Sequence, residues 1–245
     1  MILDLSIFGV VTGFVSGFFG VGGGMILVPM LLVYGFDMKQ AVSISIMQMV
    51  FSSIYGSFLN AKKYTGLLKD GSIIGIGGFI GGFQSSLVHS LVSNQVLEYL
   101  FVFIVVFAIY KIATSSAHGH EVTKKHNKIA LFFIGLVIGL VAMSIGVGGS
   151  VMLTPILVAY LHYNLKTASS LGLFFVIFSS VAGFSSQALA GEMLYNEGLI
   201  VGLSSLVGVY LGIKVKHIIN IKSYKVFILT LYVIILFSML YTLGR

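Results

Sequence analysis

The sequence predicts an all-α protein that crosses a membrane several times and is built from two related halves. Of its 245 residues, 58% are hydrophobic and only 9% are charged, and the mean hydropathy is +1.07. A soluble domain carries about 25% charged residues, so much of this chain must face lipid. This composition excludes a soluble enzyme and a nucleic-acid-binding protein. Because the chain has no cysteine, it also excludes disulfides, thiol chemistry and cysteine-based metal sites.

About eight apolar segments follow one another, separated by short polar connections. They cover residues 2–36, 41–61, 72–91, 96–114, 129–163, 168–190, 199–213 and 224–243. A helical crossing needs about 20 residues, and six of these segments fit one crossing each. The first and fifth are too long for one crossing, and each has a glycine cluster in its middle. We therefore expect these two segments to be broken helices.

The two halves of the chain carry the same motif. GFVSGFFGVGGGMILVP, from Gly13 to Pro29, aligns without gaps with GLVAMSIGVGGSVMLTP, from Gly139 to Pro155, and the two prolines of the protein fall on each other. After one inserted residue the matches continue. Lys39, Ala41, Ser43, Phe51, Ser52, Ser53 and Gly56 meet Lys166, Ala168, Ser170, Phe178, Ser179, Ser180 and Gly183. We interpret residues 1–116 and 117–245 as two copies of one transmembrane repeat.

The distribution of basic residues predicts how the halves lie in the membrane. If all eight segments cross once, the bases divide almost evenly between the two sides. If the first and fifth fold back at their glycine clusters, every base except Lys39 and Arg245 lies on one side. Cytoplasmic loops carry the excess of lysine and arginine, so the second arrangement is favoured, with basic loops cytoplasmic and both termini outside. A broken helix that crosses the membrane is the alternative.

Matching loops of the two halves carry opposite charge. Lys62, Lys63 and Lys69 correspond to the stretch around Glu192 and Glu197. Repeats with this pattern are expected to lie upside down relative to each other. Inverted repeats with interrupted helices are an architecture of transporters.

The glycine clusters are the predicted site for a small anionic substrate. Irregular backbone at membrane depth occurs only where it is buried in protein or lines a wet cavity. Each cluster precedes a half-helix whose free N–H groups and positive dipole end favour an anion. The predicted backbone ligands are Gly22, Gly23, Gly24, Gly148, Gly149 and Ser150, and Pro29 and Pro155 are expected to shape the half-helices. The alternative is that the glycines only allow close helix packing, which we expect for Gly75, Gly77, Gly78, Gly81, Gly82, Gly202, Gly208 and Gly212.

Serine hydroxyls in segments 41–61 and 168–190 are further candidates, because they can donate to an oxyanion without adding charge. The selected residues are Ser52, Ser53, Ser179 and Ser180. Hydrogen bonding back to the carbonyls of their own helix is an equal alternative for them. For the other polar residues of these segments, Gln48 among them, we expect a structural role.

Titratable groups are scarce within the segments. No acidic residue lies at the centre of a segment, so neither a carboxylate relay nor a divalent-cation site is predicted. His89 lies near the outer end of its segment and is interpreted as an interfacial histidine rather than a proton carrier. His118, His120 and His126 are interpreted as adventitious rather than as a metal site. No cofactor or catalytic group is predicted, while proton or ion coupling and the oligomeric state stay open.

The duplicated motif resembles the hallmark of the TauE/SafE family of sulfite and organosulfonate exporters. The first copy, Gly13 to Pro29, reads G-x-x-S-G-x-x-G-x-G-G-G-x-x-x-x-P, and the second differs at Ala142, Met143 and Ser150. The resemblance covers nearly the whole chain. It implies an integral membrane transporter of about eight spans for a sulfur anion such as sulfite or sulfoacetate. We expect alternating access around a midplane site; an anion channel and a non-transporting scaffold or sensor are the alternatives.

Overall fold

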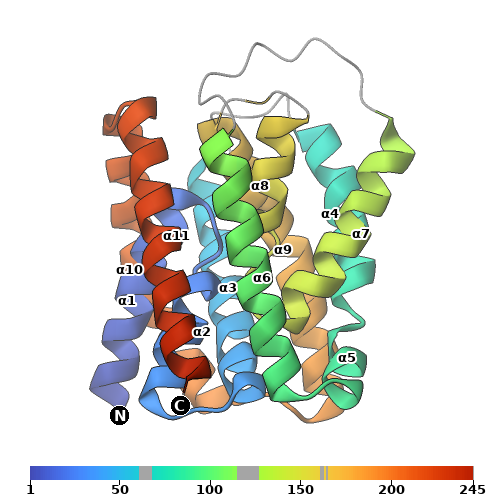
Figure 1. The fold of residues 1–245 in the computed structure, drawn as a ribbon, viewed down its shortest axis with the longest axis vertical. Helices are drawn as coiled ribbons and strands as arrows, with labels where there is room; N and C mark the ends of the chain where they lie inside the picture. The colour runs from blue at the N-terminus through green and yellow to red at the C-terminus, as the bar shows by residue number, and fades with distance from the viewer. Residues whose placement is uncertain (61–67, 115–126, 161–162, 164, 245) are drawn as a thin grey trace.

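The structure, a computed structural model, describes residues 1–60, 68–114, 127–160, 163 and 165–244. Across these ranges the only regular secondary structure is α-helix, and the helices stand side by side along the long axis (Figure 1). In chain order they are α1 (Ile2–Phe19), α2 (Gly24–Tyr34), α3 (Met38–Asn60), α4 (Leu68–Gly82), α5 (Ser85–Leu91), α6 (Asn94–Thr114), α7 (Lys128–Ser144), α8 (Ser150–Ala159), α9 (Leu165–Ala190), α10 (Tyr195–Ile218) and α11 (Ile221–Leu243).

The predicted fold class, an all-α polytopic membrane protein, is confirmed. Among the described residues, seven helical stretches are long and apolar enough to cross a membrane: Ile2–Phe19, Met38–Asn60, Gly71–Leu91, Asn94–Thr114, Thr167–Ala190, Tyr195–Ile218 and Ser223–Leu243. Shorter apolar helices cover Gly24–Tyr34, Lys128–Ser144 and Ser150–Ala159. Large apolar side chains such as Phe58, Phe103 and Phe237 are exposed on the outside, as a surface that faces lipid requires.

Both long segments are broken at their glycine clusters. The first becomes α1 and α2 and the fifth becomes α7 and α8, with residues 20–23 and 145–149 between them. The backbone has positive φ at Gly20, Gly22, Gly23, Gly146 and Gly148. Side chains with a Cβ adopt this conformation only at a cost, so glycine is what permits both turns.

The third apolar segment also breaks, which the sequence analysis did not predict. It forms α4 and the seven-residue α5, separated at residues 83–84. The amide of Gln84 donates to the Gly81 carbonyl three residues earlier, 3.1 Å away, which tightens the last turn of α4. Gly81 and Gly82 are part of the run that we assigned to helix packing, so this turn had no distinct signal.

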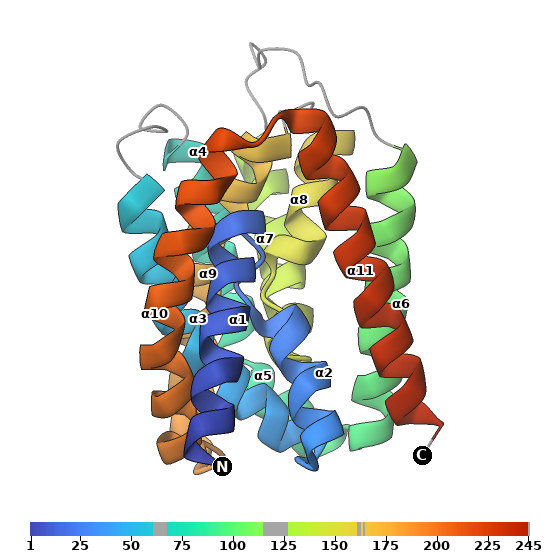
Figure 2. The same cartoon turned by 90° about the vertical axis from the view of Figure 1, so that its left-hand side faces the viewer.

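Each broken segment folds into a hairpin. In Figure 2, α1 rises from the end of the molecule that holds both termini, and α2 returns toward that end. In Figure 1, α7 descends from the opposite end and α8 climbs back to it. That these hairpins re-enter a lipid bilayer stays a prediction.

The helix contacts repeat when the two halves are exchanged. α1 packs on α10 as α7 packs on α4, and α3 packs on α10 as α9 packs on α4. α2 contacts α3 and α11, whereas α8 contacts α9 and α6. Each half therefore packs mainly against the other, and the described helices form one interleaved body. The division into repeats at 116/117 stays a prediction that this pairing supports.

Glycines make the tightest of these contacts. A Cβ at Gly13 of α1 would overlap the Ser205 carbonyl of α10, and one at Gly139 of α7 would overlap the Gly78 carbonyl of α4. The matching pair Gly202 and Gly75 each face a phenylalanine ring, Phe51 and Phe178 respectively. The helix-packing role predicted for the glycines of α4 and α10 is confirmed.

Charge separates between the two ends of the molecule. The end with the termini has five acidic residues of the described part, Asp4, Asp37, Glu98, Glu192 and Glu197, whereas Asp70 lies in the first turn of α4 at the opposite end. The opposite end has the lysines at the end of α6, the start of α7, the end of α10 and the start of α11: Lys111, Lys128, Lys214, Lys216, Lys222 and Lys225. Lys39, at the start of α3, lies at the first end.

Candidate functional site

The two glycine breaks lie against each other in the interior. A Cβ at Gly148 would lie 2.9 Å from the Val21 carbonyl oxygen and 3.7 Å from the α-carbon of Gly22. Gly24, the first residue of α2, lies directly against the Gly146 carbonyl. The Ser45 hydroxyl of α3 donates to that same carbonyl at 2.7 Å. Both interruptions therefore belong to one buried cluster.

Helices α3 and α9 cross at this cluster and hold it from two sides. A Cβ at Gly22 would meet the Val176 side chain of α9 at 3.2 Å and the Met49 sulfur of α3 at 3.3 Å. The Ser52 hydroxyl donates to the Gly22 carbonyl at 3.2 Å. A larger residue at position 22 would be strained, because φ is +83° and the Val176 and Met49 side chains would have to yield.

The N-terminus of α2 points free N–H groups into the cluster. Its N-cap residue is Gly23, and no side chain caps the helix. The first intrahelical bonds come from the amides of Ile26 and Leu27, both to the Gly23 carbonyl. The amides of Gly24 and Met25 precede them and belong to the helix end that attracts negative charge.

The Gln48 side chain of α3 lies at this helix end. A Cβ at Gly23 would be 2.7 Å from both Nε2 and Oε1 of Gln48. The side chain is fully buried, and neither amide atom has a hydrogen-bond partner among the described residues. Leaving a buried amide unpaired costs about 1–3 kcal/mol. A group that is costly to the fold and placed at a helix N-terminus is a candidate ligand-binding group.

The second break has a different lining. The ring of Phe175, which is the counterpart of Gln48 in the repeat, lies against Gly149, the N-cap of α8. Beside it are the hydroxyls of Ser150 and Thr154, buried and without partners in the described structure. A Cβ at Gly172 would come within 2.7 Å of the Ser150 β-carbon.

Small and hydroxyl residues change places between the two halves. In the first half, Gly24 of the break faces Ser45 of α3. In the second half, Ser150 of the break faces Gly172 of α9. Each pair has one glycine and one serine, so side chains of the same total size separate the break from the neighbouring helix in both halves.

The structure brings together the predicted backbone ligands, and their role in binding stays a prediction. Gly22, Gly23, Gly24, Gly148, Gly149 and Ser150 are all buried in the cluster. Pro29 and Pro155 are buried inside α2 and α8, one turn beyond the breaks.

The four predicted serines bond to backbone carbonyls. Ser53 donates to the Val50 carbonyl at 3.5 Å, and Ser180 to that of Ile177 at 3.4 Å. Ser179 donates to the carbonyls of Phe175 and Val176. Ser52 shares its hydrogen between the Met49 and Gly22 carbonyls. Of the four, only Ser52 reaches a break through a hydrogen bond within the described structure.

Sequence reasoning gave Gln48 and Thr154 too little weight. Gln48 is the one amide side chain in the middle of α3, four residues before Ser52 and hence on the same helix face. Thr154 stands where the first repeat has Val28. In each case a polar residue of one repeat stands where the other repeat has an apolar residue, which is the signal that could have found them.

The interfacial position of His89 stays a prediction, but the side chain is buried in protein. Its side chain is only 1% exposed, and Nε2 lies 2.8 Å from the carbonyl oxygen of Ser144, the last residue of α7. α7 ends in the interior, so its last carbonyls need a donor there. The loop histidines His118, His120 and His126 lie outside the described residues.

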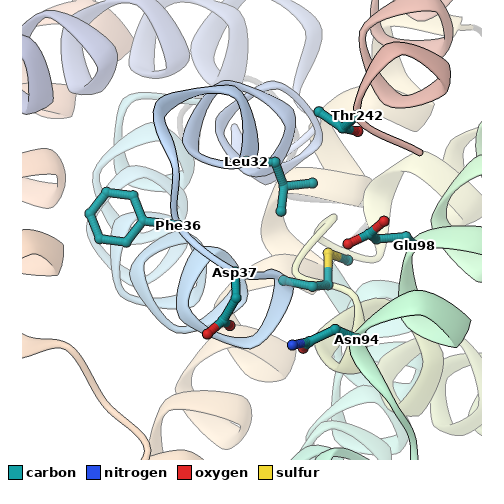
Figure 3. A pocket seen from close by; sticks show the side chains of 7 residues that line it. Leu32, Phe36, Asp37, Asn94, Glu98 and Thr242 are labelled. Atoms are coloured by element: carbon teal, nitrogen blue, oxygen red, sulfur yellow. The ribbon is translucent and has the colours of Figure 1, made fainter. Parts of the chain in front are cut away.

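A pocket of about 200 Å³ opens at the end with the termini, between α2, α3, α6 and α11. Figure 3 shows Asp37 and Glu98 among the side chains that line it, together with Asn94 and Thr242. Two carboxylates repel an anion. This pocket therefore does not match the chemistry of the cluster at the breaks.

Interrupted helices whose ends meet in the interior of an apolar helix bundle are typical of one class of protein, the polytopic membrane transporters. The family model described as sulfite exporter TauE/SafE matches residues 5–239, so the chain belongs to the TauE/SafE family. It is also 27% identical over 239 residues to a protein of Methanocaldococcus jannaschii described as a probable membrane transporter protein. That alignment covers 91% of this chain and 89% of the relative. The chain is accordingly a membrane transporter of this family.

Proposed function

We propose that this protein carries a small anion, a sulfur oxyanion or organosulfonate such as sulfite or sulfoacetate, across the cell membrane. The observation that carries the proposal is the unpaired amide of Gln48 beside the uncapped N-terminus of α2. The family description supports the sulfur chemistry of the substrate.

The anion binds where donors without partners converge. The Nε2 group of Gln48 offers two hydrogens, and the amides of Gly24 and Met25 add backbone donors. None of these groups carries a formal charge. Neutral donors hold an oxyanion without the strong Coulomb attraction of a buried cation, so release stays possible.

The second break contributes hydroxyls and an aromatic wall. Ser150 and Thr154 can each donate one hydrogen, and Phe175 provides an apolar surface. An organosulfonate has an anionic head and an apolar carbon chain. The amide side of the cluster suits the head, and the phenylalanine side suits the chain.

Alternating access follows from burial and from the paired architecture. Gln48, Ser52 and Ser150 are 0% exposed, so the site is closed to both ends of the molecule in this conformation. The backbone contacts of α1 with α10 and of α7 with α4 are tight enough for each pair to move as one body. Rocking of these pairs about the breaks would open the cluster to one side and then to the other.

The proposed orientation places the lysine-rich end in the cytoplasm and both termini outside, in keeping with the positive-inside rule. In this arrangement residues 1–116 and 117–245 are inverted repeats. The exchange of helix contacts between the halves supports this arrangement.

Uptake into proteoliposomes tests the function. Purified protein is reconstituted, and the entry of radiolabelled sulfite and sulfoacetate is measured against empty liposomes. Saturable entry, with acceleration by unlabelled anion inside, is the expected result. Large unitary currents in a planar bilayer would indicate a channel instead. No flux of either anion through folded protein would contradict the proposal.

A further inference from the structure

The buried His89 connects the second break to the end of the molecule that holds the termini. Nε2 faces the Ser144 carbonyl at 2.8 Å. On the other side of the ring, Nδ1 lies 3.4 Å from Nε2 of Gln187 and 3.4 Å from Oε2 of Glu192. The Glu192 side chain is 34% exposed, so it reaches the solvent at that end.

These contacts hold a proton on Nε2 of the ring and leave Nδ1 free to bind or release a second proton. A carbonyl oxygen only accepts hydrogen bonds, so Nε2 must carry a hydrogen. In the neutral ring, Nδ1 is then an acceptor and receives the Gln187 amide hydrogen. A second proton on Nδ1 would face the Glu192 carboxylate, which stabilises the positive ring.

Gln187 can serve both forms of the ring. Its Oε1 is buried and has no partner among the described residues. Rotating the amide by half a turn presents Oε1 to Nδ1–H in place of the amide hydrogens. The same three side chains therefore satisfy the neutral ring and the protonated ring.

Among the described side chains of the helices that pack on α5, no second charged group lies within ion-pair distance of the ring. α5 packs on α7 and α9. The described titratable residue of α7 is Lys128, at the far end of that helix, and α9 has Lys166 in its first turn, also at the far end. Glu192, which follows α9, is the charged group with an ion-pair distance to His89.

The matching position in the first half lacks such a group. The equivalent of the Ser144 carbonyl is that of Phe18, near the end of α1, and it accepts a hydrogen bond from the Tyr224 hydroxyl at 3.0 Å. A phenol does not change charge near neutral pH. An imidazole can bind a second proton at its other ring nitrogen, so the two contacts differ in the chemistry that they offer.

We propose that His89 is a proton-binding site, loaded through Glu192 from the end with the termini, and that its proton travels with the anion. The inference rests on the proposed transport function. The proton forms an N–H bond at Nδ1 and gives a positive charge to the ring, which contacts the carbonyl of Ser144, the residue directly before the second break. A positive charge there favours the anion, and by linkage the bound anion favours the proton. The two therefore load together and move in the same direction.

Proton binding is measured directly on the full chain in lipid nanodiscs. Long-range ¹H–¹⁵N spectra are recorded between about pH 5 and 8, the range in which an imidazole titrates. The His89 signals are assigned by their disappearance in His89→Gln. The ring nitrogens are expected to titrate, with a different midpoint in Glu192→Gln. Signals that do not change over this range would overturn the proposal whether or not any anion is transported.

Coupling is measured in proteoliposomes with the membrane potential clamped at zero. Sulfoacetate is the probe, because its charge is constant in this pH range, whereas sulfite titrates. One-to-one symport accumulates the anion about tenfold for a gradient of one pH unit. His89→Gln should lose this accumulation but keep exchange of internal for external sulfoacetate, and His217→Gln should match wild type.

The two failures are distinguishable. Accumulation that persists in His89→Gln overturns the proton site and leaves transport standing. Absence of sulfoacetate exchange in the wild-type protein counts against the proposed function, while the spectra still decide whether His89 binds a proton.

Discussion

The side-chain amide of Gln48 touches Gly23 so closely that a single methyl group at Gly23 would come within 2.7 Å of both its nitrogen and its oxygen. The contact joins the middle of α3 to the start of α2. It leaves the amide buried without a partner and next to uncapped backbone N–H groups. The first two predictions follow from this pair.

Gly23→Ala should abolish transport, whereas the protein should still fold with a modest loss of stability. The new methyl displaces the Gln48 amide, and the positive φ of 88° adds about 1–2 kcal/mol of strain. Gly35→Ala is the matched control, because Gly35 has φ 112° and no atom within 4 Å of the added Cβ. Thermal unfolding and sulfoacetate exchange are measured for both. Equal loss of transport in the two variants would show that backbone strain alone is responsible.

Gln48→Leu should make the protein more stable and less active. Removing an unpaired buried amide recovers about 1–3 kcal/mol, which raises the melting temperature by roughly 2–12 °C for a chain of this size. The same change removes two donors from the site. Such opposite effects on stability and function are typical of binding groups. If stability falls instead, Gln48 has a structural partner and the site assignment is wrong.

The pseudo-symmetry predicts paired rescues. Gly202→Ala and Gly75→Ala each place a methyl about 2.5 Å from a phenylalanine ring carbon, and overpacking of this kind costs about 1–3 kcal/mol. Phe51→Leu should rescue the first variant and Phe178→Leu the second. The unmatched combinations, Gly202→Ala with Phe178→Leu and the reverse, serve as controls. Rescue by the unmatched partner would contradict the contacts.

Single cysteines can establish the topology, because the chain has none of its own. Ser93, Asn196, Thr114 and Asn220 are exposed positions near helix ends. With two re-entrant hairpins, cysteines at 93 and 196 react with an impermeant reagent on intact cells, and those at 114 and 220 react only after lysis. With eight single crossings, the cysteines at 93 and 220 would react from one side of the membrane, and those at 114 and 196 from the other.

The breaks were predictable because two independent signals coincide in them. A segment of about 35 residues is too long for one crossing, and the Gly22–Gly24 and Gly148–Gly149 clusters offer a place to turn. Both signals depend on local sequence alone. The segment that contains the break between α4 and α5 is no longer than one crossing requires. Its glycines also serve helix packing, so the sequence did not distinguish a break from a packing contact.

The site required knowledge of how the helices pack. Gln48 and Ser52 share one face of α3, but nothing local tells which face meets α2. His89 looked interfacial from its place near the end of a segment. It is buried because α7 stops at Ser144 inside the molecule and leaves a carbonyl for the ring. The surroundings of Gln48 depend on where α2 begins, and those of His89 depend on where α7 ends.

The most direct measurement is equilibrium binding of radiolabelled sulfite and sulfoacetate to the purified wild-type protein, to Gln48→Leu and to Gln84→Leu. Gln84 is an exposed amide whose nitrogen bonds to the Ile80 carbonyl of its own helix turn, so its loss controls for the substitution itself. Loss of donors in a desolvated site should weaken binding by about tenfold or more. The account predicts this loss in Gln48→Leu and wild-type binding in Gln84→Leu. Unchanged binding by folded Gln48→Leu protein would contradict an anion site at the glycine breaks.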